Sequence, residues 1–562
     1  MQIINPILTG FNPDPSIIRV DDDFYIATST FEWFPGVQIH HSKDLVNWRL
    51  LTRPLRRKSQ LDMMGEGYSM GVWAPCLSYS YFDQCFYLVY TDAKQTGTTH
   101  NYLVTTSDIL GEWSDPIYLN SRGFDSSLFH DDDGKKWIVQ MYFDHIAWSM
   151  FVELNHESKN NLTTQRLLHQ YHNYNKDRPL FKGILLQEYD SSKNKLVGDV
   201  YKIFDQVIGI TEGPHLYKKD EYYYLLTAEG GTGFNHSVTM ARAKKLTGPY
   251  EIHPHNPILS SKNKKCVLQK AGHADLVELK NRDVYMVHLC SRPLKQNFGS
   301  VLGRETAIQK MRWGDDGWLH LDNAVPAEKV PAPDLKLVAW PSQRIRDDFD
   351  EQELGIEYQW LRGDILQEIA SLSERPGYLR LKGKEMVLSR YKQSLIARRQ
   401  QSFCYQAITA MEFEPDEENQ MAGLIVYYCE KLFYYLYLGF DQKIGKFLSV
   451  MVNNMGDIDL YAAGSWAGGR IGTGGIVAGG GRLEIDKGVD NLSPKRVYLK
   501  AEVNYDKLQF FYSFSDISEN DCKNDCKNDW NKIGEELDMT IISDEHSFGF
   551  TGAFIGICCH DP

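Results

Sequence analysis

The sequence predicts an all-β protein in which a five-bladed β-propeller is followed by an antiparallel β-sandwich. Helical 3.6-residue hydrophobic patterns are sparse, and short runs that alternate with period two are frequent. The first half of the chain also repeats one strand–turn–strand pattern five times, which indicates radial repetition. At 562 residues the chain is too long for one ordinary core, so two domains are expected.

Each of the five repeats runs from a small or acidic residue through apolar positions and a polar turn to an aromatic-rich strand. They read NPDPSIIRVDDDFYIAT, VWAPCLSYSYFDQCFYLVYT, GFDSSLFHDDDGKKWIVQM, TEGPHLYKKDEYYYLLTA and AGHADLVELKNRDVYMVHL, starting at Asn12, Val72, Gly123, Thr211 and Ala271. Each predicts a hairpin with its turn at DDD, FDQ, DDDG, KKDE or KNRD. Units of roughly 50–60 residues with further strands predict four-stranded blades. A generic β-sandwich with chance similarity between segments is the alternative.

Superposing the repeats brings five residues to one equivalent position, namely Asp14, Ala74, Asp125, Gly213 and His273. In a propeller the starts of the innermost strands converge at one end of the central axis. In two repeats the preceding residue, Trp73 or Glu212, carries the side chain of interest. We therefore expect Asp14, Trp73, Asp125, Glu212 and His273 to surround a single point. Three of these side chains are carboxylates, and like charges in a partly desolvated pocket cost free energy unless they serve a function.

This combination of side chains suits glycoside hydrolysis, in which two carboxyl groups flank the scissile bond. One carboxyl group must be protonated to donate to the leaving oxygen, and the other must be ionised to activate water or attack carbon. A third carboxylate nearby would raise the pKa of the acid and keep it protonated near neutral pH. The aromatic rings of Trp73 and Phe31 are expected to stack against sugar faces.

The composition of the sequence changes near Val325, which predicts a domain boundary. The segment VPAEKVPAPDLKLVAWP contains four prolines and indicates a linker or strap over 326–345, after a catalytic propeller over 1–325. Residues 346–562 are then expected to form the sandwich, a concanavalin-like jelly roll. Its clearest hairpin is KRVYLKAEVNYDKLQFFYSF, in which alternate apolar residues share a face on either side of an Asp-Lys turn.

Charge and composition argue against several other functions. A net charge of −13 disfavours binding to nucleic acid or to a membrane surface. No apolar run approaches the length of a membrane span, and no signal-peptide pattern is visible, so a cytoplasmic location is expected.

Three further segments are assigned no chemistry. The polar, histidine-rich segment 155–179 is interpreted as a surface loop insertion rather than a ligand set. The DCKNDCKND segment, with Cys522 and Cys526, reads as a tandem duplication rather than a metal site. The glycine-rich stretch from Gly464 lacks the Lys-Ser/Thr of a phosphate-binding loop.

Six ordered motifs carry a specific resemblance that extends over nearly the whole chain. They are NPDPSIIRVDDDFYIATSTFEWFPGVQIHHSKDLVNW, VWAPCLSYS, FDSSLFHDDDGKKW, ITEGPHLYKK, AEGGTGFNHSVTMARA and LGRETAIQ. Together they resemble glycoside hydrolase family 43, and more narrowly its β-xylosidases with an appended C-terminal sandwich. The resemblance implies a five-bladed propeller and hydrolysis with inversion at the anomeric carbon.

Carried over to this chain, the resemblance implies a role for each of the three acids. Asp14 would be the general base that activates water, and Glu212 the general acid. Asp125 would tune the pKa of the acid and orient it. An inverting mechanism implies that the base and acid carboxyl groups lie about 6.5–9.5 Å apart, which leaves room for a water molecule.

The resemblance also implies substrate-binding residues. Phe31 and Trp73 would wall the pocket for the terminal sugar, and Arg304 in LGRETAIQ would contact sugar hydroxyls near the acid. Ordinary core packing for Trp73 and a structural ion pair for Arg304 are the alternatives. In the sandwich, HSFGFTGAFIG would lend Phe550, or else Phe554, to close the pocket and make the enzyme exo-acting.

No cofactor is expected to be required. His273 matches a histidine that in some members of the family helps to hold a divalent cation, often Ca²⁺, and in others contacts only water. A buried, hydrogen-bonded histidine without a metal is the alternative.

Two departures from the family pattern stand out. Cys76 occupies the position after Ala-Pro where the family has His, which would alter local hydrogen bonding. The chain also stops at CCHDP, where relatives run on, which is expected to weaken the sandwich or the pocket lid.

The expected function is that of an exo-acting, inverting β-xylosidase. It would release xylose from the non-reducing end of short β-1,4-xylo-oligosaccharides, with side activity on α-L-arabinofuranosides. A dedicated α-L-arabinofuranosidase is the alternative within the enzymes, and a non-catalytic carbohydrate-binding propeller is the alternative outside them. The resemblance further implies a homodimer or homotetramer.

Overall fold

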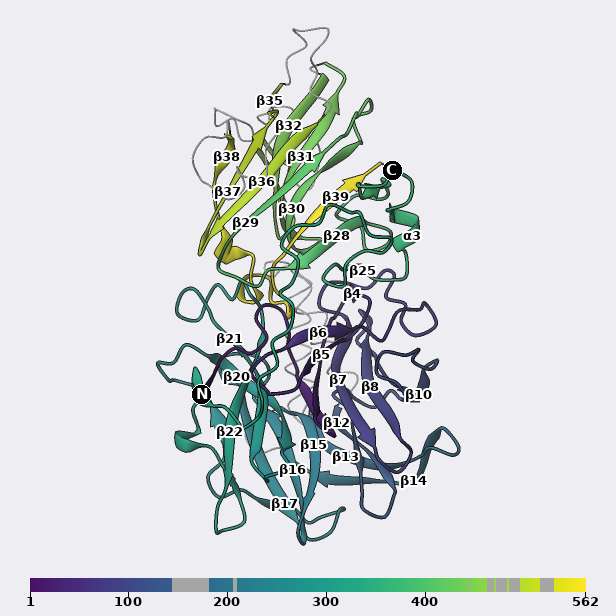
Figure 1. Ribbon diagram of the computed structural model, residues 1–562, viewed down its shortest axis with the longest axis vertical. Helices are drawn as coiled ribbons and strands as arrows, with labels where there is room; N and C mark the ends of the chain where they lie inside the picture. The colour runs from purple at the N-terminus through teal and green to yellow at the C-terminus, as the bar shows by residue number, and fades with distance from the viewer. Residues whose placement is uncertain are drawn as a thin grey trace, which may run out of the picture. The chain divides into compact units, whose positions relative to one another are not determined.

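The computed structural model describes residues 1–143, 181–205, 210–443, 445–461, 469–471, 483–484, 496–515 and 530–561 (Figure 1). Segment 155–179 and the cysteines Cys522 and Cys526 therefore lie outside the described residues, as does most of the glycine-rich stretch. The chain divides into two compact units. The first comprises Met1–Arg292 and Arg304–Ser342, and the second comprises Pro293–Gly303 and Gln343–Pro562.

The described part of the first unit contains five consecutive antiparallel sheets, as a propeller requires. The first sheet consists of β2 (Ser16–Val20), β3 (Asp23–Thr28), β5 (Gln38–Ser42) and β6 (Arg49–Thr52). The second consists of β7 (Gly71–Ser80), β8 (Cys85–Ala93), β9 (Thr99–Thr106) and β10 (Ile117–Asn120). The third consists of β11 (Ser127–His130), β12 (Lys136–Phe143), β13 (Phe181–Asp190) and β14 (Lys195–Phe204). The fourth consists of β15 (Thr211–Lys219), β16 (Tyr222–Glu229), β17 (Ser237–Ala243) and β18 (Glu251–Ile252), with β19 (Leu259–Ser260) beside β17. The fifth consists of β20 (Gln269–Glu278), β21 (Val284–Ser291), β22 (Glu305–Trp313) and β23 (Leu319–His320). The short strand β4 (Trp33–Phe34) lies between β3 and β5 in the chain.

The first strands of the five sheets contact one another in cyclic order. Strand β2 contacts β7, β7 contacts β11, β11 contacts β15, β15 contacts β20, and β20 returns to β2. Each first strand pairs with the second strand of its sheet through the predicted hairpin, for example with Val20 opposite Asp23 and Lys219 opposite Tyr222. The β-propeller expected from the repeats is thus confirmed.

The N-terminal segment and the strap pair with each other in a separate two-stranded sheet of the first unit. Strand β1 (Gln2–Ile4) pairs antiparallel with β24 (Lys329–Pro331), which follows the one-turn 3₁₀ helix η1 (Asp322–Ala324). Further along the strap, the Val338 N–H donates to Asp44 over 2.8 Å, and the Arg49 guanidinium lies 4.0 Å from the Trp340 ring centroid. The proline-rich segment therefore packs on the first unit rather than hanging free.

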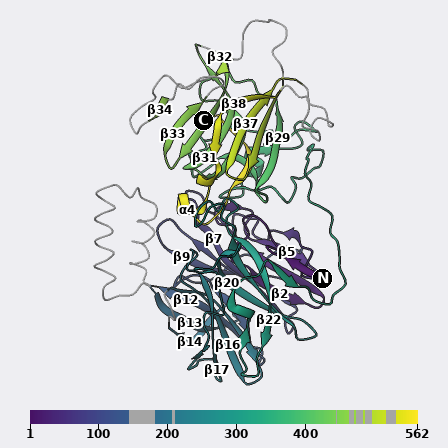
Figure 2. The ribbon, with the colours of Figure 1, turned by 90° about the vertical axis from the view of Figure 1, so that its left-hand side faces the viewer.

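The second unit contains the expected sandwich of two antiparallel sheets. The larger sheet has the order β28 (Ser394–Arg399), β39 (Phe554–His560), β30 (Met421–Cys429), β31 (Leu432–Asp441), β32 (Gly445–Asn454), β33 (Asp457–Tyr461) and β34 (Gly469–Ile471), with β35 (Leu483–Glu484) beside β32. The smaller sheet has the order β29 (Cys404–Met411), β36 (Val497–Asn504), β37 (Lys507–Ser513) and β38 (Asn531–Asp538). Strands β30 and β32 contact β36 and β38 respectively, so the two sheets pack face to face (Figure 2).

The hairpin predicted in this sandwich is formed by β36 and β37. Its turn falls at Tyr505 and Asp506, one residue before the expected Asp-Lys pair, because Asn504 pairs with Lys507. Leu499 and Leu508 are fully buried on the face that the alternation predicted, whereas Phe514 lies beyond the strand and is exposed. Short elements complete the unit: β25 (Trp360–Leu361), α3 (Leu366–Ile369), β26 (Ala370–Ser371), β27 (Arg380–Leu381), η2 (Met539–Ile541) and α4 (Asp544–Ser547). Within the parts of the chain that the structure describes, no helix has the length and apolar character to cross a membrane.

The segment Pro293–Gly303 belongs to the second unit although both neighbours in the chain belong to the first. Within that unit Ser300 donates its backbone N–H and its hydroxyl to the two oxygens of Glu545. A Cβ on Gly303, whose φ is +67°, would lie 2.0 Å from the Thr551 carbonyl oxygen. Only glycine fits so close an approach, and the sequence did not predict this excursion.

Candidate active site

The five residues that the repeats superposed share an unusual backbone conformation. Their φ angles are all positive, at 53° for Asp14, 37° for Ala74, 52° for Asp125, 55° for Gly213 and 45° for His273. Residues other than glycine rarely adopt this region, and such backbone strain collects at functional sites. In the second, fourth and fifth sheets the pairing register shifts beside this residue, so each strand carries a bulge there.

Asp14 lies two residues before β2 and is buried, with both carboxylate oxygens engaged. Arg304 donates from its guanidinium to Oδ1 over 2.8 Å, and the Ser29 hydroxyl donates to Oδ2 over 2.7 Å. The backbone supports this pair, because the Asn12 N–H donates to the Arg304 carbonyl and the Thr306 hydroxyl donates to the Asn12 carbonyl.

Electrostatics keep Asp14 ionised. Burial by itself raises the pKa of Asp14, but the positive charge of Arg304, the nearby His273 and the hydrogen bond from Ser29 together outweigh burial. The pKa of Asp14 therefore lies below its ordinary value of 3.8. An ionised, buried carboxylate that is already oriented is suited to accept a proton from water.

Glu212 has the opposite protonation state. Burial, followed by repulsion from the Asp14 carboxylate, raises the pKa of Glu212 from 4.5 to about 8. Its Oε1 atom is buried and has no hydrogen-bond partner among the described residues. Glu212 is thus a protonated carboxylic acid at neutral pH with an oxygen available to a ligand.

Asp125 is linked to Glu212 through the next residue in the chain, because the Gly213 N–H donates to Asp125 Oδ2 over 3.0 Å. Burial and the charge of Glu212 raise the pKa of Asp125, so the two acids compete for protons. The N–H bond from Gly213 lowers the pKa of Asp125 only in part, so that pKa stays well above its ordinary value of 3.8. A side chain at Gly213 would be crowded and strained, since a Cβ would lie 3.0 Å from the His273 ring and φ is +55°.

His273 lies between the base and the third acid. Its Nδ1 atom is 3.9 Å from both Asp14 Oδ1 and Asp125 Oδ2, and burial lowers its pKa to about 4. It is therefore neutral at physiological pH. Among the described residues no group of three or more His, Cys, Asp or Glu side chains has the geometry to hold a metal ion. A divalent cation near His273 stays a prediction, and no step is assigned to a cation.

Aromatic rings form a continuous series beside these acids. The Phe31 ring centroid is 5.6 Å from Phe11 and 6.2 Å from Trp73, and Trp73 is 5.5 Å from Phe124. The Trp73 indole N–H donates to the Ser69 carbonyl, and Arg304 lies 5.3 Å from the Phe31 centroid. The structure thus joins Phe31, Trp73 and Arg304. Arg304 binds the base Asp14, and its charge also lowers the pKa of the acid Glu212.

Phe550 and Phe554 both lie in the second unit. Phe550 is partly buried and precedes Thr551, whose N–H donates to the Tyr428 hydroxyl over 3.2 Å. Phe554 begins β39 and is fully buried, with the Arg399 guanidinium 5.3 Å from its ring centroid. Closure of the sugar pocket by Phe550 stays a prediction.

Sequence reasoning missed two buried residues of this site, Ser29 and His236. His236 donates from Nδ1 to the Lys270 carbonyl, and its Nε2 has no partner among the described residues. Its ring rests on Gly272, where a Cβ would lie 2.4 Å away. The motif GFNHSV contains His236 and was noted for its resemblance only; no spacing rule pointed to the histidine itself.

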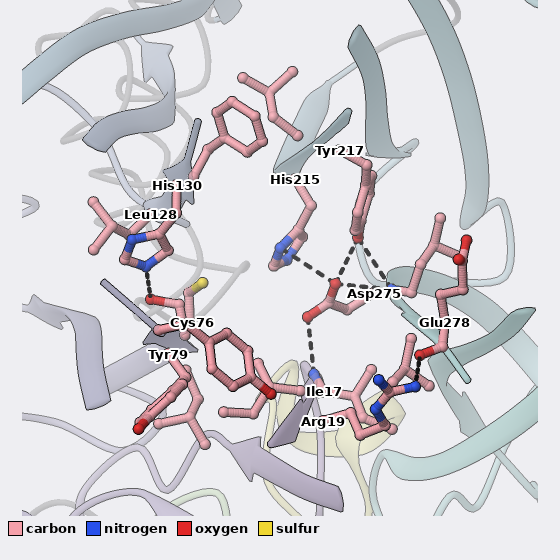
Figure 3. A pocket seen from close by; sticks show the side chains of 18 residues that line it. Ile17, Arg19, Cys76, Tyr79, Leu128, His130, His215, Tyr217, Asp275 and Glu278 are labelled. Carbon is pink, nitrogen blue, oxygen red and sulfur yellow. Dashed lines mark hydrogen bonds and ion pairs between the residues drawn. The ribbon is translucent and has the colours of Figure 1, made fainter. Parts of the chain in front are cut away.

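A cavity of about 340 Å³ lies further along the same five first strands (Figure 3). Asp275 organises it by accepting the Ile17 N–H and the Ser16 hydroxyl at Oδ2 and the Tyr217 hydroxyl at Oδ1. Cys76 also lines it, and burial raises the pKa of its thiol to about 12. The cavity confirms that the five strands converge, and it contains none of the three acids of the site.

The site contains an ionised carboxylate, a protonated carboxylic acid and a third acid close to both, and a series of aromatic rings lies beside them. This combination defines a glycosidase that works by general acid–base catalysis. Comparison with known proteins agrees. The profile of glycosyl hydrolases family 43 matches residues 3–319, and that of the β-xylosidase C-terminal concanavalin A-like domain matches residues 346–562. The chain belongs to glycosyl hydrolases family 43.

Three similar proteins match along nearly their whole length. The "xylosidase/arabinosidase 43B" of Humicola insolens is 43% identical, with 100% of this chain and 95% of that protein covered. The "xylan 1,3-beta-xylosidase" of a Vibrio species is 40% identical, with 100% of this chain and 96% of that protein covered. A crystal structure of xylan β-1,4-xylosidase from Bacillus halodurans C-125 superposes with a TM-score of 0.85 at 43% identity, with 100% and 97% covered.

Proposed function

We propose that this protein is an exo-acting, inverting β-xylosidase that releases xylose from short xylo-oligosaccharides and also cleaves α-L-arabinofuranosides more slowly. The observation that carries the chemistry is the pair of buried carboxyl groups of Asp14 and Glu212, whose pKa values are shifted in opposite directions. The full-length similarity to proteins named as xylosidases supports the choice of sugar.

Each acid has one task in the proposed reaction. Asp14 takes a proton from a water molecule as the water oxygen attacks the anomeric carbon from the face opposite the leaving group. Glu212 gives its proton to the glycosidic oxygen as the bond from that oxygen to the anomeric carbon breaks. Asp125 holds the backbone at Gly213 and opposes ionisation of Glu212. After one turnover Asp14 is protonated and Glu212 ionised, and exchange with solvent restores both.

The substrate can be tested with xylotriose labelled with ¹⁸O at its reducing end. We expect unlabelled xylose and labelled xylobiose as first products, with the released xylose appearing first as the α-anomer by NMR. We also expect a higher kcat/KM for p-nitrophenyl β-xyloside than for p-nitrophenyl α-L-arabinofuranoside. The reverse ratio would support the arabinofuranosidase alternative, and no turnover of either would support the binding propeller.

The linkage needs its own comparison, because the relatives named above differ in it. We expect β-1,4-xylobiose to be cleaved faster than β-1,3-xylobiose, as the name of the Bacillus halodurans structure suggests. Faster cleavage of the 1,3-linked disaccharide would instead place this chain with the Vibrio protein.

The pH dependence of kcat/KM follows from the two pKa shifts. Activity requires ionised Asp14, so the rate rises with pH through a pKa below 3.8. It also requires protonated Glu212, so the rate falls as pH passes about 8. We expect a broad bell-shaped profile with a wide plateau between these limits. An alkaline limb that begins near the ordinary glutamate pKa of 4.5 would contradict the assignment of Glu212.

A further inference from the structure

Ser29 follows β3 directly and is fully buried. Its backbone N–H donates to the Pro13 carbonyl over 3.2 Å, and its hydroxyl donates to Asp14 Oδ2 over 2.7 Å. Its Oγ atom also accepts the Ala74 N–H over 2.8 Å. Ser29 therefore joins the turn that carries the base to the bulged strand of the second sheet.

These bonds leave the Ser29 hydroxyl a single orientation. A serine hydroxyl has one hydrogen, and an ionised carboxylate only accepts hydrogen bonds. Because the Ala74 N–H occupies Oγ as a donor, the hydroxyl hydrogen must point to Asp14. Arg304 holds the other oxygen of Asp14, so the carboxylate is fixed at both ends and each oxygen keeps a lone pair for water.

We propose that Ser29 is a positioning residue that holds the Asp14 carboxylate in the orientation needed to take a proton from the attacking water. This inference rests on the proposed function of Asp14 as the base. It assigns Ser29 no contact with substrate. A residue that acts in this way should affect turnover rather than substrate affinity, since it orients a catalytic group and not the sugar.

The hydrogen bond from Ser29 also lowers the pKa of Asp14, after the larger effects of burial, Arg304 and His273. Removing it should therefore raise the pKa of Asp14. The acid limb of the pH profile should move to higher pH, which loss of packing alone would not cause.

Thr28 provides a matched control. It is the preceding residue, it is equally buried, and its hydroxyl has no hydrogen-bond partner among the described residues. Thr28→Val removes that hydroxyl without changing shape. Ser29→Ala removes the hydroxyl that donates to Asp14.

The experiment compares kcat, KM and the pH profile of wild-type protein, Ser29→Ala and Thr28→Val on the aryl glycoside that the wild type hydrolyses. We expect Ser29→Ala to lose roughly 10- to 100-fold in kcat with KM nearly unchanged, and its acid limb to lie at higher pH. Thr28→Val should match wild type. A folded Ser29→Ala protein with the kcat and acid limb of Thr28→Val would overturn the proposal.

Ser29→Cys decides the question if Ser29→Ala does not fold. The thiol is a weaker donor in nearly the same shape, so we expect a smaller loss of kcat than for full removal and a smaller displacement of the acid limb in the same direction. A Ser29→Cys protein identical to wild type would reject the inference. Failure of the proposed function is a different outcome, because it would be seen in the wild-type protein itself.

Discussion

Asp14→Asn is expected to lower kcat by about 10³- to 10⁴-fold on every substrate. The amide keeps the size of the carboxylate and can still accept from Ser29, but it cannot take a proton from water. Activation of water is needed whatever the leaving group is. We therefore expect the same loss with p-nitrophenyl and with 2,4-dinitrophenyl glycosides, while KM changes little.

Asp44→Asn serves as the control for removing a buried carboxylate from the same sheet. Asp44 accepts the backbone N–H groups of Val46, Asn47 and Val338 and takes no part in the site. Its replacement should lower the melting temperature and leave kcat within about twofold, in line with an ordinary buried hydrogen-bond acceptor. An Asp14→Asn variant that keeps more than a tenth of the wild-type kcat would show that Asp14 is not the base.

The propeller and the location of its site could be predicted because they follow from short-range patterns that recur. Every hairpin has its turn where polar residues interrupt alternating apolar ones, so the five repeats can be superposed on one residue. Superposition therefore sufficed to bring together Asp14, Asp125 and His273. Asp125 lies 111 positions after Asp14 in the chain (125 − 14), and His273 lies 259 positions after it (273 − 14). The shared positive φ shows that the repeat extends to the backbone.

Ser29 could not be found in this way, because its role depends on single contacts without a recurring pattern. It stands in IATSTFEW, where it reads as the polar end of a strand, and its partner Ala74 comes from the next repeat. Arg304 was found by resemblance as a residue near the acid, and its charge acts on Glu212. The structure pairs it with Asp14 across 290 residues of chain, a distance over which no local rule applies.

The excursion of Pro293–Gly303 was missed for a related reason. The sequence marked one change of texture, near Val325, and the prolines after it. The segment joins the second unit through Glu545 and Thr551, more than two hundred residues away, and its composition gives no sign of this. Long-range partners of this kind are the part of the fold that periodicity cannot reveal.

Glu212→Gln is expected to lower kcat by an amount that depends on the leaving group. With xylotriose, whose leaving sugar needs a proton, the loss should reach about 10³-fold. With a 2,4-dinitrophenyl glycoside, whose leaving group departs as a stable anion, the loss should be within about tenfold. The alkaline limb near pH 8 should also disappear, because the group that titrates there has been removed.

The contrast with Asp14→Asn makes this prediction specific. Both variants replace a buried carboxyl group by an amide in the same site, so damage to packing or substrate binding would affect the two substrates in similar proportion. Only loss of the proton donor makes the outcome depend on the leaving group, because the water-activating step is untouched. If Glu212→Gln loses activity equally on both substrates and keeps its alkaline limb, then another group supplies the proton. The raised pKa of Glu212 would then reflect burial and the Asp14 charge without a catalytic use.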